Sequence, residues 1–153
     1  MKKLFVISIV IIIVIGLSAL IGLGGSQPKN VGDAKVTSLA ACNESKTNCV
    51  ASNASTPYHA MEAWKVKDSL KTMTALSKLI SETPQANIII HKNNYLYIQY
   101  KSTFFKFIDD VEFLLTSNDL IQFRSASRLG KKDFGVNRER INQLEILLRK
   151  RLK

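Results

Sequence analysis

The stretch that decides the fold of this chain is Phe105-Lys-Phe-Ile-Asp-Asp-Val-Glu-Phe-Leu-Leu-Thr116, followed by Ile121-Gln-Phe-Arg-Ser-Ala-Ser-Arg-Leu129. Apolar and charged residues alternate in both stretches, as they do on a strand with one face on a core. Ser117-Asn-Asp119 between them is typical of a turn. The two stretches therefore predict an antiparallel hairpin with one apolar face and one charged face.

Alternation assigns the charged residues of the hairpin to its two faces. The charged face receives Asp110, Glu112, Arg124 and Arg128. A three-residue loop, Asn118 to Leu120, predicts that Phe123 lies opposite Leu115 and Arg128 opposite Asp110, with Glu112 diagonally between the two arginines. Either the four charges neutralise one another and hold the strand register, or the arginines hold an anionic group. Both interpretations stay open.

Asp109 falls on the apolar face of the hairpin, where an unpaired carboxylate is costly. It needs a partner, for which the candidates are Ser125, Ser127, Arg138, Arg140 and the backbone amides that start the last helix. The strand-to-helix loop that follows contains Asp133, and Asn137 is predicted to cap the last helix. The whole candidate functional cluster is Asp109, Asp110, Glu112, Arg124, Ser125, Ser127, Arg128, Asp133, Asn137, Arg138 and Arg140.

The flanking sequence predicts an α+β fold. Val66 to Glu82 has a helical period carried by Val66, Leu70, Met73, Leu76 and Ile80. Ala86 to Ile90 and Tyr95 to Lys101 are two strands around an Asn-rich turn, and a helix runs from Asn137 to the C-terminus. The prediction is a four-stranded antiparallel meander with two helices packed on one face, and His59 to Trp64 as a candidate edge strand in front.

The N-terminus carries a membrane or export signal. Leu4 to Leu23 contains no charge, and a helix of that length spans roughly 30 Å. We expect residues 1–24 to be an uncleaved anchor, with a cleaved signal as the alternative, residues 25–38 to be a linker and residues 39–153 to be the domain. Lysines before the helix favour a single-pass protein of the cytoplasmic membrane, with its domain in the periplasm or outside the cell.

The net charge limits the binding partners to expect, and the two cysteines indicate the compartment. The formal net charge is +10, of which Lys2 and Lys3 supply two. Such a domain suits a membrane surface, an anionic lipid or glycan, or an envelope protein, and no nucleic acid is expected beside a membrane helix. Cys42 and Cys49 are predicted to form a disulfide outside the cytosol. Lipidation at Cys42, after Leu39-Ala-Ala, is the weaker alternative.

The sequence contains no familiar motif for catalysis or metal binding. The chain has no Gly-x-Ser-x-Gly, no phosphate loop and no histidine pair at metal spacing, so no catalytic residue, metal or cofactor is assigned. His59 and His91 are expected to be solvated. Tyr95, Tyr97 and Tyr100 are interpreted as sheet surface and core.

Several motifs together resemble one family. They are Leu39-Ala-Ala-Cys42, Asn48-Cys-Val-Ala-Ser52, Phe107-Ile-Asp-Asp-Val-Glu-Phe-Leu114, Arg124-Ser-Ala-Ser-Arg-Leu-Gly130, Asp133-Phe-Gly-Val-Asn-Arg138 and Arg140. From about Leu39 to Leu148 the chain resembles the domain of unknown function 1499. The resemblance implies a shared architecture and an association with envelopes or organelles, and it supplies no mechanism.

The function expected from the sequence is that of a non-enzymatic, membrane-anchored envelope module that binds an anionic lipid, glycan or protein. The alternative is an envelope hydrolase or transferase. It would use Asp109, Asp110 or Glu112 as acid or base, with Arg124 and Arg128 holding an anion. An enzyme requires a cleft at the charged cluster, whereas a binding module requires only an accessible surface.

Overall fold

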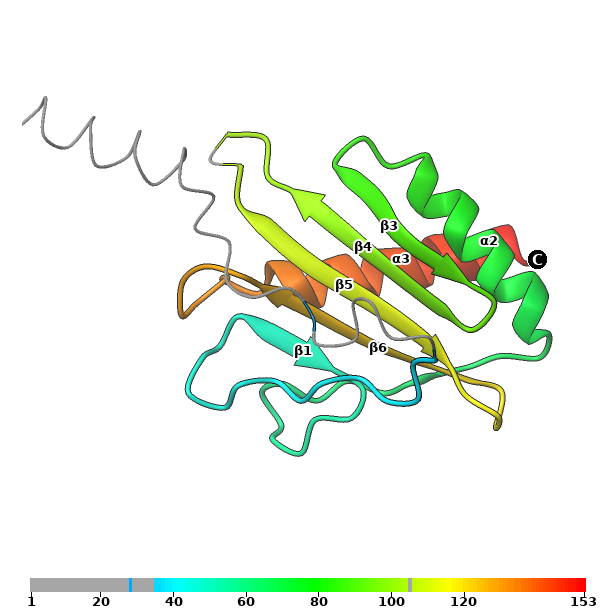
Figure 1. The fold of residues 1–153 in the computed structure, drawn as a ribbon, viewed down its shortest axis with the longest axis horizontal. Coiled ribbons are helices and arrows are strands. Elements are labelled where there is room, and N and C mark those ends of the chain that lie inside the picture. Colours follow the sequence, from blue (N-terminus) through cyan, green and yellow to red (C-terminus); the bar gives the residue numbers. More distant parts are fainter. Residues whose placement is uncertain (1–27, 29–34, 105) are drawn as a thin grey trace, which may run out of the picture.

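A computed structural model describes residue 28, residues 35–104 and residues 106–153. Within them the chain forms one mixed α+β domain (Figure 1). The elements in chain order are β1 (Cys49–Ala51), β2 (Trp64–Lys65), α2 (Ser69–Ser81), β3 (Ala86–Lys92), β4 (Tyr95–Lys101), β5 (Ile108–Leu115), β6 (Leu120–Ser127) and α3 (Val136–Arg151).

The four long strands form the predicted antiparallel meander. The sheet order is β1-β6-β5-β4-β3, and β2 also pairs with β6, so the described residues make six strands. Two of them differ from the sequence prediction. β1 was not predicted, and the candidate edge strand at His59 to Trp64 contributes only Trp64 to β2. Both short strands pair antiparallel with β6 and cover the edge that the meander would otherwise leave open.

A side-chain cap defines the start of helix α2. Asp68 is its N-cap and accepts a hydrogen bond from the Lys71 amide at 2.9 Å, which satisfies one of the amides that the first turn leaves without a partner. The predicted helix was three residues too long at its start. Leu70, assigned to the apolar stripe, is 70% exposed, whereas Leu79 is buried. The stripe follows Met73, Leu76 and Ile80 as predicted.

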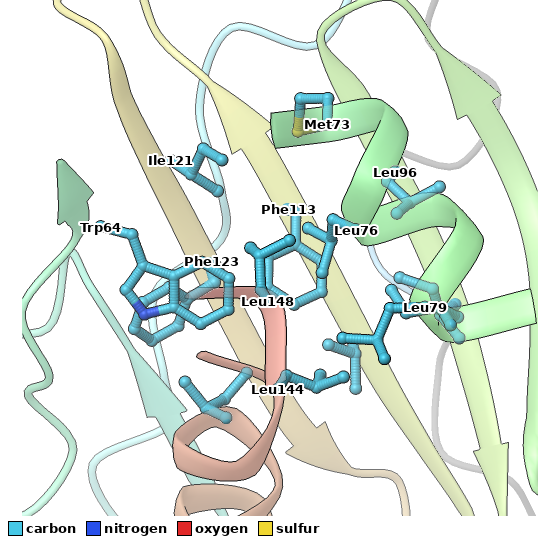
Figure 2. Close-up of a cluster of buried hydrophobic side chains, with 14 of the residues drawn as sticks. Trp64, Met73, Leu76, Leu79, Leu96, Phe113, Ile121, Phe123, Leu144 and Leu148 are labelled. Carbon is cyan, nitrogen blue, oxygen red and sulfur yellow. The ribbon is translucent and has the colours of Figure 1, made fainter. Parts of the chain in front are cut away.

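The hydrophobic core lies between one face of the sheet and both helices (Figure 2). Leu76 and Leu79 from α2 and Leu144 and Leu148 from α3 pack over the sheet, as Figure 2 shows. The sheet contributes Leu96, Ile98, Tyr100, Val111, Phe113, Ile121 and Phe123. Trp64 completes an aromatic cluster, with its ring 5.2 Å from that of Phe123 and 5.4 Å from that of Phe113.

The register of the central hairpin differs from the prediction by two residues. Phe123 pairs with Phe113, and Ile121 with Leu115. Because side chains alternate with a period of two, this shift leaves every residue on its predicted face. It changes the partners, however: Glu112 lies directly opposite Arg124, and Asp110 opposite Ala126. The first strand also starts later than predicted, since Phe107 precedes β5 and is 49% exposed.

The second face of the sheet is covered by the segment before β1. Val36 and Leu39 pack against Tyr95, Tyr97 and Leu114. The Cys42–Cys49 disulfide joins this segment to β1 and thus to the sheet edge. A face that lacks helices is therefore still buried, although Val36 falls in the stretch predicted to be a linker.

The predicted anchor or signal at residues 1–24 lies outside the described residues. Among the helices that the structure does describe, neither is long and apolar enough to cross a membrane.

Candidate functional site

Asp110 is the centre of a buried polar network on the face without helices. It is 3% exposed, and Arg128 grips it with two nitrogens, Nε at 2.7 Å from Oδ2 and Nη2 at 2.8 Å from Oδ1. The Tyr97 hydroxyl donates to Oδ1 at 2.7 Å and also lies 2.9 Å from Arg128 Nη2 and from Gln99 Nε2. A forked, charge-assisted pair of this kind fixes both orientation and charge. Arg128 reaches Asp110 diagonally, not from the directly opposite position that was predicted.

Glu112 forms the second half of this network. Its side chain is fully buried, and its Oε1 accepts a hydrogen bond from the Tyr95 hydroxyl at 2.7 Å. Arg124 Nη1 lies 3.5 Å from Oε2, so this ion pair is longer than that of Asp110. The Arg124 side chain is 17% exposed, and its buried Nε has no hydrogen-bond partner among the described residues. Arg124 is therefore more loosely paired than Arg128.

Both tyrosines are held in their neutral, donating form. Burial and the hydrogen bond to Asp110 raise the pKa of Tyr97 to about 12. Burial and the neighbouring Glu112 carboxylate raise the pKa of Tyr95 well above its usual range. The hydrogen bonds to Asp110 raise the pKa of Arg128 against the effect of its burial. The network therefore holds both phenols and the Arg128 guanidinium in their protonated forms near neutral pH.

Asp109 belongs to a separate network on the helix-bearing face. Arg140 of α3 places Nη2 2.5 Å from Asp109 Oδ2, which selects one of the partners predicted for this carboxylate. The same guanidinium lies over the Tyr100 ring, 4.6 Å from its centroid. Arg140 also donates to Ser125 Oγ at 3.1 Å and to Asn137 Oδ1 at 2.6 Å. Asp109 thus attaches β5 to the start of α3.

Asn137 is a buried connector and not the predicted helix cap. It lies inside α3, whose N-cap is Gly135 with a φ of 85°. The Asp133 carboxylate accepts from the amides of Gly135 at 3.1 Å and Asn137 at 2.9 Å. The Asn137 amide nitrogen reaches Ser127 Oγ at 3.0 Å and the Asn48 carbonyl at 3.1 Å. Its oxygen accepts from Ser125 at 2.6 Å.

The side chains of Arg138 and His59 contact backbone carbonyl oxygens. Arg138 donates to the carbonyl of Tyr58 at 2.6 Å and to that of Ala60 at 3.2 Å, so it fastens α3 to the loop before β2. The expectation that His59 is solvated was wrong. It is 3% exposed, and its Nδ1 lies 2.8 Å from the Cys49 carbonyl oxygen. His91 is exposed, as expected.

A cavity of about 420 Å³ opens over the Asp110 network. Arg124, Arg128 and Asp110 form its floor, and Lys46 and the Cys42–Cys49 disulfide lie in its walls. Three cationic side chains and one carboxylate therefore line one hollow. Asp109, on the opposite face of the sheet, has no part in it. No group of His, Cys, Asp and Glu side chains suited to a metal ion occurs among the residues described.

Sequence reasoning brought the right acids and arginines together but missed the neutral residues that join them. Tyr95 and Tyr97 were read as ordinary sheet residues, and Asn48 was not singled out. The Asn48 side chain donates to the carbonyls of Ser127, Leu129 and Gly130 at 2.9–3.3 Å, which pins the loop after β6. One signal for the tyrosines was present: strand alternation places Tyr95 and Tyr97 on the face opposite the core residues Leu96 and Ile98.

The fold and the two networks define a class: an α+β domain whose single sheet carries an ionic network on each face, buried around Asp110 and partly buried around Asp109. The model of one family, described as Protein of unknown function (DUF1499), matches residues 38–148, and the chain belongs to this family. Comparisons with curated proteins and with solved structures found no match.

Proposed function

We propose that the domain is a binding module for a small anionic group, a carboxylate or a phosphate ester carried by an envelope lipid, glycan or protein. The observation that carries this proposal is the position of Arg124 at the cavity floor. Its side chain lines the cavity and is partly exposed, and its contact to Glu112 is long, 3.5 Å. Guanidinium forks bind planar carboxylates and phosphates through paired hydrogen bonds.

The neighbouring residues support the same assignment. Arg128 is paired with Asp110, which holds both side chains in place at the cavity. Lys46 adds a further positive charge to the cavity lining. The cavity is small, so it suits a headgroup, a sugar acid or a terminal carboxylate and not an extended polymer. Its walls include the disulfide, which holds them in place relative to β1.

The hydrolase or transferase alternative has weaker support from the geometry. A general acid or base must exchange a proton with the substrate, and the candidate at the cavity is Asp110. Both of its oxygens already accept hydrogen bonds from Arg128 or Tyr97. Glu112 is covered completely, and Asp109 lies on the other face.

The envelope location is also part of the proposal. The apolar run Leu4 to Leu23 and the disulfide, a bond typical of oxidising compartments, support a domain held outside the cytoplasmic membrane. N-terminal sequencing of the protein from native membranes tests the anchor. A mature start near Gly25, or a lipid-modified Cys42 at the terminus, would refute it.

Calorimetric titration with acetate, glucuronate and glycerol phosphate tests the binding site. We expect saturable binding of at least one of them to the full chain in detergent. Lys46→Gln should weaken it several-fold, because one cation in the wall is lost while the floor stays intact. Lys78→Gln, which removes the same charge from an exposed position on α2 away from the cavity, is the matched control.

Arg124→Gln should abolish binding, with folding verified by circular dichroism. If no probe binds, or if Lys46→Gln and Lys78→Gln lower the affinity equally, the cavity is not an anion site.

A further inference from the structure

The domain has a second basic hollow, which shares no lining residue with the Arg124 cavity. It has a volume of about 480 Å³ and is formed where the entry to α2 meets the end of α3. Five cations and one acid line it. The cations are Lys65, Lys67, Lys71, Arg149 and Lys153. None of them lines the Arg124 cavity, so the two hollows are separate.

The charges of this hollow are mostly uncompensated. Among the described residues, no salt bridge involves any of its four lysines, and Arg149 alone pairs with an acid, Glu145. The single acid of the lining, Asp68, is committed to capping α2 through the Lys71 amide. The hollow therefore carries an excess of positive charge.

Apolar groups accompany these lysines. Val66 and Leu152 line the hollow and pack on the edge of the core, so its base is apolar. Leu70 projects from the first turn of α2 between Lys67 and Lys71 in sequence and is 70% exposed. A cationic hollow with apolar lining, next along the chain to an exposed leucine, matches a lipid interface, which offers phosphates to the ammonium groups and acyl chains to the leucine. A free phosphate would use only the charges.

We propose that this surface, defined by Lys65, Lys67, Leu70, Lys71 and Lys153, docks the domain onto a bilayer that contains anionic phospholipids. Each cation near such a leaflet strengthens binding by roughly fivefold, and salt weakens the attraction. The inference does not rest on the anion cavity: one site holds a single group, and the other orients the whole domain. It requires only that a membrane be within reach.

Residue-resolved labelling of the full chain tests this proposal. The protein is reconstituted into phosphatidylcholine vesicles with or without phosphatidylglycerol and treated with an amine-acetylating reagent. Modification is then measured at each lysine by mass spectrometry. We expect several-fold protection of Lys65, Lys67 and Lys71 relative to Lys131 and Lys132, only in the anionic vesicles, and its loss at high salt. Comparing lysines within one sample removes the effect of how the protein inserts.

Two matched variants separate a local surface from net charge. Lys65, Lys67 and Lys71 are replaced together by Gln in one, and the exposed Lys101, Lys131 and Lys132 in the other. Leu70→Cys is then introduced into both variants and labelled with a polarity-sensitive fluorophore. On anionic vesicles the emission should shift to the blue in the control variant and should not shift in the Lys65, Lys67 and Lys71 variant. Equal labelling of all lysines in both vesicle types overturns the proposal. Protection by soluble glycerol phosphate without vesicles also overturns it and indicates a free phosphate ligand.

Discussion

Arg140 on α3 and Asp109 on β5 form an ion pair of 2.5 Å that joins the last helix to the middle of the sheet. Tyr100, the residue directly opposite Asp109 on β4, lies beneath the same guanidinium. One arginine therefore satisfies a carboxylate that strand alternation places on the apolar face. The pair explains why an acid is tolerated at a position where Val111 and Phe113 continue the core.

A double-mutant cycle should show strong coupling in this pair. Asp109→Asn and Arg140→Gln each remove one charge and leave the other partly buried, whereas the double variant removes both. We expect a coupling energy of about 1–3 kcal/mol in urea unfolding. Strict additivity of the two single variants would show that Arg140 acts through Ser125, Asn137 and Tyr100 and not through Asp109.

Arg128→Ala should destabilise the domain far more than Arg149→Ala. Its loss strands the buried Asp110 carboxylate, for which removal of one partner costs about 3–5 kcal/mol. Arg149 pairs with Glu145 one turn away on a surface where its side chain is 58% exposed, so about 0–1 kcal/mol is expected. Thermal unfolding of both variants provides the comparison. Similar, small shifts in Tm would contradict the assigned network.

Alkaline pH should weaken the fold through Tyr97. Its folded pKa of about 12 lies above the ordinary value of 10.0, so the neutral phenol is the form that the fold stabilises. This contribution is complete below about pH 10 and is lost as the pH rises through about 12. Free energies of unfolding measured across that window should fall, and fall less steeply for Tyr97→Phe. A Tyr97→Phe protein with an unchanged slope would assign the alkaline loss to other groups.

The disulfide should stabilise the segment that covers Asp110 and Glu112. The Cys42–Cys49 bond closes a short loop, and replacing both cysteines by Ser should cost about 2–3 kcal/mol on the chain-entropy model. Hydrogen exchange should then rise in residues 36–48 before it rises in β5. Mass spectrometry of unreduced protein taken directly from cells checks the bond itself; two alkylated thiols there would refute it.

Alternation and apolar periods, which are local properties, determined much of this protein. They suffice for the four meander strands, the two helices and the face on which each charged residue lies. The pairing of the two cysteines followed from their nearness in the sequence. Alternation suffices for the faces because a strand repeats every two residues, so even a register error of two leaves each side chain on its face. Asp109 could thus be recognised as a carboxylate in need of a partner before its partner was known.

Only the tertiary structure determined which side chains contact one another. The position of the turn sets the register: the Thr116 amide donates to the Leu120 carbonyl, so the loop is residues 117–119. Glu112 therefore faces Arg124, and Arg128 reaches Asp110 diagonally. Residues 36–48 fold back over the open face, which turns a surface network into a buried one and leaves a cavity above Arg124. Asn137 and Asn48 act on loops far away in sequence. Such contacts depend on packing across the whole domain, because a hydrogen bond needs two groups within about 3 Å and sequence spacing constrains only near neighbours.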